Sequence, residues 1–197
     1  MKVSRENALP VGFDNGLGQI QEWILAGREC TPAPEKGQVH PMDIRQDYLD
    51  FLLKYKGDWS GLKIAMDVSN GMASLFVRDI FGDQPAYIYD EMDGSFPNHE
   101  PNPLVQKNVQ DLKKLVAQTK ADIGVIFDGD ADRVMFVDEN SRFISPDLMI
   151  AVLGHYFLEE RGEKGYVHQD IRSSKAVGEY LAPMGGVMNT WRVGRAY

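Results

Sequence analysis

Residues 122–137 read Asp-Ile-Gly-Val-Ile-Phe-Asp-Gly-Asp-Ala-Asp-Arg-Val-Met-Phe-Val. Two apolar runs with many β-branched residues, 122–127 and 134–137, enclose six residues that carry three carboxylates and one guanidinium. Short apolar runs bounded by polar residues are typical of buried strands. The stretch therefore predicts two neighbouring strands joined by a loop in which the chemically active side chains are concentrated.

On either side of this stretch, strand-like and helix-like patterns alternate. Further strands are expected at 62–68, 86–89, 166–171 and 187–191, and helices at 14–27, 44–55, 73–81, 102–116 and from 145 onward. Alternation of this kind predicts an α/β protein, with a layered mixed sheet, helices flanking it and at least partly parallel strand pairing. A segment that is poor in apolar residues and carries three prolines, 28–41, predicts a domain boundary.

The composition excludes several classes of protein. The 197 residues are 43% hydrophobic and 25% charged, which is ordinary for a globular chain. The net charge of −8 argues against a general nucleic-acid binder. The longest apolar stretch, 148–158, is shorter than the roughly 20 residues that a membrane span needs. The single cysteine, Cys30, cannot form a disulfide within the chain, and the N-terminal residues show no charged-then-apolar leader pattern. We therefore expect a cytoplasmic protein. Its oligomeric state stays open.

The loop itself predicts a metal site. Asp128, Asp130 and Asp132 occupy alternate positions, so a curved loop turns all three carboxylates toward one point. Two carboxylates about 4 Å apart repel by about 4 kcal/mol at the effective dielectric of a protein surface, so three require a cation. Oxygen ligands favour a hard ion, Mg²⁺ first and Ca²⁺ or Mn²⁺ after it, and three protein ligands leave positions open for a phosphate. Arg133 beside them would be a permanently charged fork for that phosphate.

Two other interpretations of the loop compete with this one. An acidic loop between strands can simply face solvent, and that alternative stays open. An EF-hand calcium loop needs glycine at its sixth position and a helix after it. Here the sixth position is Arg133, and the strand-like run 134–137 follows. The EF-hand is therefore excluded.

At this loop the sequence resembles the α-D-phosphohexomutases, the family of phosphoglucomutase and phosphomannomutase, whose magnesium loop reads Asp-Gly-Asp-(Gly/Ala)-Asp-Arg. Three further segments follow the family's order: Asp-Val-Ser-Asn-Gly at 67–71, Asp-Gly-Ser-Phe-Pro-Asn-His-Glu-Pro-Asn-Pro at 93–103, and Val-Gly-Arg at 193–195. Residues 1–7 look like the segment just after the family's active-site serine loop. The resemblance therefore covers essentially the whole chain.

The resemblance implies an internal fragment of a four-domain enzyme. Residues 1–39 would be the tail of the first domain and its linker. Residues 40–141 would be the complete second domain, of phosphohexomutase domain 2 type, which carries the metal loop. Residues 142–197 would be the incomplete start of the third domain, a second α/β domain.

The same resemblance implies an activity and its residues. Family enzymes transfer a phosphoryl group intramolecularly between C1 and C6 of a hexose phosphate, through a phosphoserine and with Mg²⁺. Asp128, Asp130 and Asp132 would hold the Mg²⁺, and Arg133 would stabilise the phosphoryl group in transfer. Substrate-binding residues would be Arg172, Gly194 and Arg195. His99 and its neighbour Asn98 are expected to be structural.

The sequence also departs from the family pattern. The serine loop Thr-Ala-Ser-His-Asn-Pro and the sugar-binding loop Gly-Glu-x-Ser-Gly-His are both absent from the 197 residues. We therefore expect this chain alone to be catalytically inactive. A stand-alone module that binds metal or a phosphosugar without catalysis is the alternative. The choice among glucose, mannose and glucosamine phosphates stays open.

Overall fold

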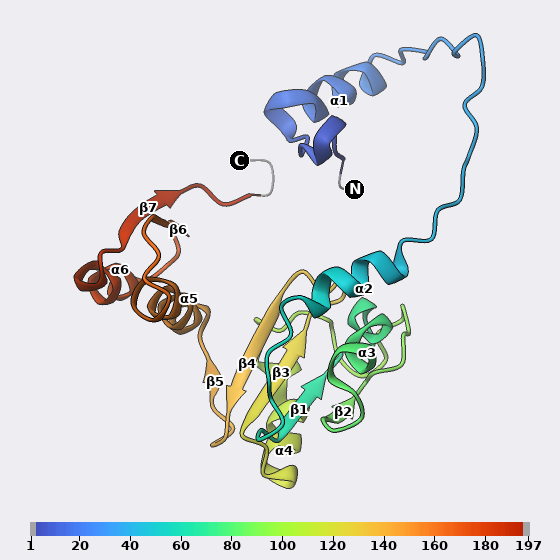
Figure 1. Cartoon of the computed structure of the whole chain (residues 1–197). Helices are drawn as coiled ribbons and strands as arrows, with labels where there is room; N and C mark the ends of the chain where they lie inside the picture. The colour runs from blue at the N-terminus through green and yellow to red at the C-terminus, as the bar shows by residue number, and fades with distance from the viewer. Residues whose placement is uncertain (1–2, 195–197) are drawn as a thin grey trace. The chain divides into compact units, whose positions relative to one another are not determined.

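The structure is a computed structural model that describes residues 3–194. Its contacts divide the chain into two units, one made of residues 42–150 and the other of residues 1–41 and 151–197. Figure 1 traces the elements of both units along the chain. Among the described residues, no helix has the length and apolar character that a membrane crossing requires.

The unit of residues 42–150, called the central unit below, is built on a five-stranded mixed sheet. Its strands are β1 (Ile64–Asp67), β2 (Ala86–Ile88), β3 (Ile123–Phe127), β4 (Val134–Asp138) and β5 (Phe143–Ile144), in the order β2-β1-β3-β4-β5. β1 pairs in parallel with β2 and β3, whereas β4 pairs antiparallel with β3 and β5. The predicted α/β class, with a mixed sheet and flanking helices, is confirmed.

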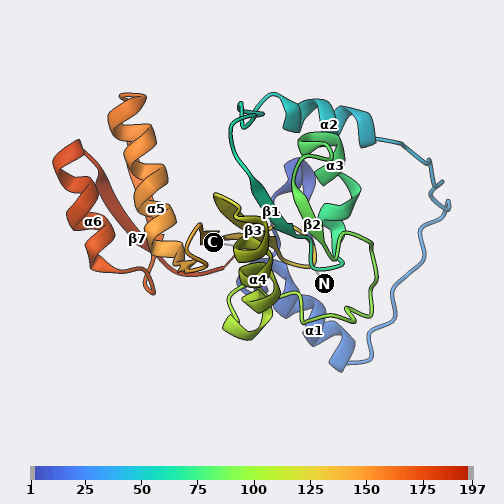
Figure 2. The same ribbon diagram turned by 90° about the horizontal axis from the view of Figure 1, so that it is seen from below.

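One face of this sheet is covered by α4 (Gln110–Thr119), as Figure 2 shows. The buried side chains Leu112 and Val116 of the helix pack with the strand residues Ala65, Ile126 and Val137. Burial of each such side chain stabilises the fold by about 1.5–3 kcal/mol. A helix with one apolar face and one sheet face therefore forms the main core of the unit.

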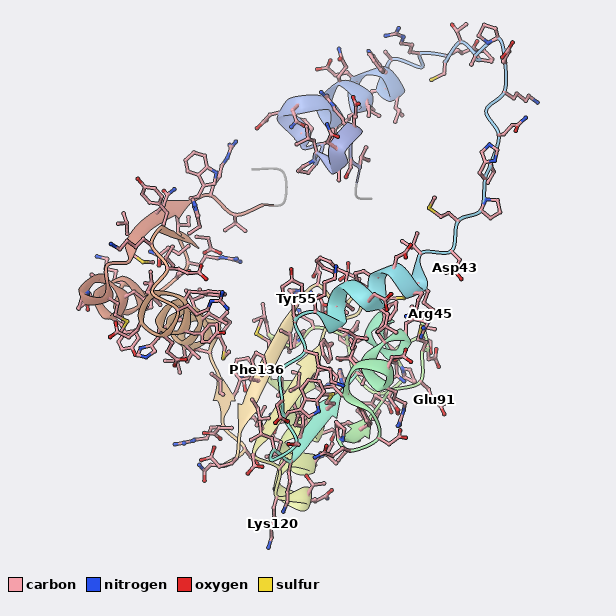
Figure 3. The ribbon with its side chains drawn as sticks, in the orientation of Figure 1. Asp43, Arg45, Tyr55, Glu91, Lys120 and Phe136 are labelled. Carbon is pink, nitrogen blue, oxygen red and sulfur yellow. The ribbon has the colours of Figure 1, made fainter. Side chains whose placement is uncertain are left out.

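The opposite face of the sheet is covered by α2 (Arg45–Leu53), the 3₁₀ turn Met72–Leu75 and α3 (Val77–Phe81). Val68, Ala73 and Val77 form a second buried cluster there. Arg45, labelled in Figure 3, fastens α2 to α3 through an ion pair with Asp79 at 2.6 Å. The unit is thus a three-layer α/β/α arrangement.

Two helices differ from those expected, and one strand, β5, is additional. The helix expected at 73–81 is interrupted at Phe76, whose φ of −133° is not helical and whose ring packs edge-on against Tyr48. The helix expected from residue 102 starts only at a 3₁₀ turn, Gln106–Val109, because the Asn102 carbonyl accepts a bond from the Asn108 side chain at 2.9 Å. The two-residue strand β5 is too short to have a sequence period.

The other unit consists of two stretches of chain. The first contains short turns at Glu6–Ala8 and Phe13–Leu17 and the helix α1 (Gly18–Leu25). The second contains α5 (Pro146–His155), which begins in the central unit, a π-helical turn Tyr156–Glu160, β6 (Tyr166–Asp170), α6 (Lys175–Leu181), a 3₁₀ turn Ala182–Met184 and β7 (Val187–Trp191). β6 and β7 pair in parallel through the α6 crossover. α5 packs closely against α6 at Gly154, where a side chain would meet Leu181 at 2.5 Å.

Candidate metal centre

The loop of residues 128–133 joins the antiparallel strands β3 and β4. Its ends are held by the pairing of Phe127 with Val134 and by a bond from the Asp128 N–H to the Arg133 carbonyl at 3.1 Å. Inside the loop, the Ala131 N–H donates to the Asp128 carbonyl at 3.2 Å, and Ala131 adopts a left-handed φ of +59°. The loop is therefore a closed turn whose shape is fixed by its own backbone.

The fold brings the three predicted aspartates together. One carboxylate oxygen from each of Asp128, Asp130 and Asp132 lies within 4.8 Å of the others. Asp128 is buried, whereas Asp130 and Asp132 are exposed. A cluster of three like charges with only oxygen donors suits a hard divalent cation, and the exposed side leaves room for further ligands. These residues fit Mg²⁺.

Arg133 is tied to this cluster rather than pointing freely into solvent. Its Nε donates to Oδ2 of Asp128 at 2.6 Å, and its backbone N–H donates to Oδ1 of the same carboxylate at 3.1 Å. Nε also lies 3.8 Å from Oδ1 of Asp132. The side chain remains 45% exposed, so the guanidinium borders the carboxylates with part of its surface open to an anion.

Two other segments of the central unit contact this loop. The Met72 N–H donates to the Gly129 carbonyl at 3.0 Å. A side chain on Gly71 would meet that same carbonyl oxygen at 2.8 Å, so the two segments touch through bare backbone. A side chain on Gly129 would meet Pro101 at 3.3 Å and Phe96 at 3.5 Å. The turn after β1 and the proline-rich segment after β2 thus both pack on the metal loop.

A buried ion pair lies in this support, and sequence reasoning did not single it out. Nε2 of His99 donates to Oδ2 of Asp67 at 3.0 Å, and the two side chains are only 8% and 0% exposed. The hydrogen bond to Asp67 raises the pKa of His99, against the opposing effect of burial. Both residues stand in segments that carry the family resemblance, 67–71 and 93–103, which was the available signal.

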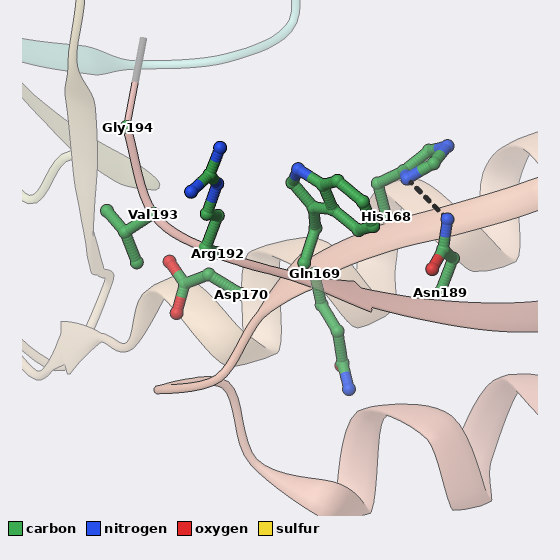
Figure 4. A pocket seen from close by; sticks show the side chains of 8 residues that line it. His168, Gln169, Asp170, Asn189, Arg192, Val193 and Gly194 are labelled. Carbon is green, nitrogen blue, oxygen red and sulfur yellow. Dashed lines mark hydrogen bonds between the residues drawn. The ribbon is translucent and has the colours of Figure 1, made fainter. Parts of the chain in front are cut away.

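The predicted substrate-binding residues belong to the other unit. Arg172 forms an ion pair with Asp170 at 2.7 Å and is 70% exposed. Gly194 lines a pocket of about 570 Å³ at the ends of β6 and β7 (Figure 4). Asp170, Trp191 and Arg192 line the same pocket. Arg195 lies outside the described residues.

The sequence of this chain is similar to those of known proteins. The family described as "Phosphoglucomutase/phosphomannomutase, alpha/beta/alpha domain II" matches residues 46–141. A protein of Xanthomonas campestris pv. campestris (strain B100) named "Phosphohexose mutases" is 32% identical over 202 residues, which cover 100% of this chain and 45% of that protein. A phosphomannomutase of Methanocaldococcus jannaschii is 33% identical, over 79% of this chain and 35% of that protein.

The fold comparison agrees with the sequence comparison. A crystal structure of a phosphoglucomutase/phosphomannomutase family protein from Burkholderia thailandensis superposes with a TM-score of 0.79 and 26% identity, over 91% of this chain and 40% of that one. The chain thus spans less than half the length of these relatives. It belongs to the phosphoglucomutase/phosphomannomutase family, and residues 46–141 are the domain II of that family.

Proposed function

We propose that the chain is the metal-binding middle part of a Mg²⁺-dependent phosphohexomutase, which moves a phosphoryl group between C1 and C6 of a hexose phosphate in the cytoplasm. The observation that carries this proposal is the convergence of Asp128, Asp130 and Asp132 within 4.8 Å beside Arg133. In this scheme residues 1–39 are the tail of a first domain and its linker, 40–141 the second domain, and 142–197 the start of a third.

The residues divide the work of phosphoryl transfer between them. Bound Mg²⁺ would neutralise the charge that develops on the transferring group. The buried Asp128 gives one ligand oxygen a fixed position, because both of its oxygens also accept bonds from Arg133. Asp130 and Asp132 present their oxygens from the exposed side. The remaining N–H groups of the Arg133 guanidinium would donate to the phosphoryl oxygens and so position the phosphoryl group through hydrogen bonds and charge.

The sugar phosphate itself would be bound by the other unit. We assign Arg172, Gly194 and Arg195 to substrate binding, and Gly194 lines a pocket that also holds polar groups from both strands of the small sheet. The names of the relatives include both phosphomannomutase and phosphoglucomutase. A hexose phosphate is therefore the class of substrate that we propose.

Metal titration tests the core of this proposal. Mn²⁺, followed by the decrease of its free electron paramagnetic resonance signal, should bind the wild-type chain at one site and be displaced by excess Mg²⁺. Asp130→Asn should weaken binding by about 10-fold or more, because it removes one of three charged ligands. Glu160→Gln, which makes the same charge change at an exposed residue of the other unit, is the matched control. Equal affinity in both variants would exclude the loop as the metal site.

The same chain distinguishes catalysis from simple binding. A stand-alone binding module would bind Mn²⁺ and hexose phosphate but would show no turnover when joined to the remaining domains of a family member. A mutase fragment should restore turnover in that chimera, in place of the equivalent residues of the recipient. Loss of that turnover in the chimera with Asp130→Asn would assign it to the metal loop.

A further inference from the structure

A buried, charged pair in the central unit has no part in the proposed chemistry. Asp67 stands at the end of β1 and is fully buried, and His99 reaches it from the irregular segment after β2. Oδ1 of Asp67 accepts the Ser69 N–H at 2.9 Å, and Oδ2 accepts from Nε2 of His99 at 3.0 Å. Burying two ionisable side chains costs free energy unless each is hydrogen-bonded, so we expect this pair to contribute to stability or function.

The imidazole of His99 is held at both nitrogens. Nδ1 faces the Glu100 carbonyl at 2.9 Å, which can only accept, and Nε2 faces the Asp67 carboxylate. Both contacts are satisfied when both nitrogens carry protons, so the geometry suits an imidazolium beside a carboxylate. Tyr89 packs edge-on against this ring at 5.5 Å and donates to Asp111 of α4 at 3.0 Å. Three contacts, with Asp67, the Glu100 carbonyl and Tyr89, thus fix the orientation of the ring.

The pair joins two loops that have little regular structure of their own. Asn70 extends the connection, because its carbonyl accepts the Asp93 N–H at 3.0 Å and its Nδ2 donates to the Glu91 carbonyl at 2.8 Å. Nδ2 of Asn98 donates to Oδ1 of Asn70 at 2.8 Å. The turn after β1, residues 68–72, and the segment 90–103 are therefore one bonded body.

This body is also what touches the metal loop. Oγ of Ser69 donates to the Phe127 carbonyl at 2.7 Å, immediately before Asp128. The Met72 N–H donates to the Gly129 carbonyl, between Asp128 and Asp130, and a side chain on Gly129 would meet Pro101 of the other segment at 3.3 Å. Each contact falls on the backbone next to a proposed ligand, at Phe127 or Gly129.

We propose that Asp67 and His99 are positioning residues for the metal loop: their ion pair locks residues 68–72 and 90–103 together, and the locked body sets where Gly129 places Asp128 and Asp130. The link to metal affinity rests on the proposed function, whereas the link to loop order does not. Residues that orient metal ligands in this way typically change metal affinity about 10–100-fold when they are removed.

Hydrogen exchange of the metal-free chain tests the locking directly. In His99→Leu, the amides of Met72 and Arg133, which donate to Gly129 and Asp128, should exchange about 10-fold faster or more, while the buried α4 amide of Val116 keeps its rate. His40→Leu, at an exposed histidine of the linker, is the matched control. If His99→Leu does not fold, His99→Gln, which keeps one amide N–H for Asp67 but carries no positive charge, should accelerate the same two amides to a smaller extent.

Asp67→Asn provides the rescue arm. Its amide can donate to a neutral His99 whose Nδ1–H still bonds the Glu100 carbonyl, so the loop amides should keep nearly wild-type exchange. Mn²⁺ affinity should fall about 10-fold or more in His99→Leu and remain near wild type in Asp67→Asn. Unchanged exchange at Met72 and Arg133, or equal acceleration at Val116, would overturn the proposal. If the wild-type chain binds no Mn²⁺, the proposed function fails, and the exchange arm still decides this inference.

Discussion

Nε of Arg133 lies 2.6 Å from Oδ2 of Asp128, so the guanidinium at the edge of the metal loop is anchored to the loop's one buried carboxylate. The two residues stand five positions apart, one at each end of the loop. Their bond therefore joins the two ends of the loop and places the positive charge of Arg133 beside the carboxylates.

Arg133→Leu should lower the free energy of unfolding of the metal-free chain. The substitution leaves the buried Asp128 carboxylate with its backbone donor alone, which costs about 1.5–3 kcal/mol for a hydrogen bond to a charged group. Urea unfolding followed by circular dichroism measures the change. Arg142→Leu, which removes an exposed arginine bonded to Asp138, should cause a much smaller loss. Equal losses in the two variants would mean that the Asp128 bond contributes nothing beyond a surface ion pair.

The stability of the chain should depend on pH through His99. The hydrogen bond to Asp67 raises the pKa of this histidine above its ordinary value of 6.5. The stabilisation is therefore complete below about pH 6.5 and is lost as the pH rises through the higher folded-state pKa. Urea unfolding between pH 6 and 9, the range flanking the histidine titration, should show this decline in wild type and not in His99→Gln.

The acidic side of the pH profile has a different origin. Bonds from Lys114 and Tyr89 lower the pKa of Asp111, so the contribution of this carboxylate to folding stability is lost only as the pH falls through the acidic range.

For the alkaline side, a loss of stability in His99→Gln that is the same at every pH would contradict the assignment of the decline to His99.

Gly71→Ala should disturb the metal loop from outside it. The added methyl group would lie 2.8 Å from the Gly129 carbonyl oxygen, and backbone must move to relieve the contact. We expect a destabilisation of about 1–3 kcal/mol and weaker Mn²⁺ binding. Gly61→Ala, where nothing lies within 4 Å of the new methyl group, should be neutral or slightly stabilising. Thermal unfolding and Mn²⁺ titration of both variants check the pair.

The isolated chain should not convert glucose 1-phosphate to glucose 6-phosphate with Mg²⁺ present, because its sequence contains no Thr-Ala-Ser-His-Asn-Pro serine loop. A coupled dehydrogenase assay measures the product, and a full-length family member serves as the positive control. Turnover by the purified chain that disappears in Asp130→Asn would show that this expectation is wrong.

The sequence predicts the parts of this fold that depend on local pattern. The apolar runs at 122–127 and 134–137 become β3 and β4, and the polar residues between them form the loop, because strand burial and turn chemistry act over a few residues. The convergence of the three aspartates follows from their alternate spacing once the loop is closed.

The parts that the sequence did not predict depend on distant contacts. His99 and Asp67 are 32 residues apart, and the parallel pairing of β1 with β2 brings their loops together. The break at Phe76 follows from packing against Tyr48 on another helix. Neither contact leaves a periodic signal in the chain, so only the folded arrangement reveals them.

Ala131 holds a left-handed backbone conformation that costs a non-glycine residue about 1 kcal/mol or more. The bond from the Ala131 N–H to the Asp128 carbonyl holds this conformation within the backbone of the loop, so the turn does not depend on the carboxylate side chains. The loop should then capture and release its ion with little rearrangement. In the function proposed above, such a loop would let its ion exchange quickly as a phosphate arrives and leaves.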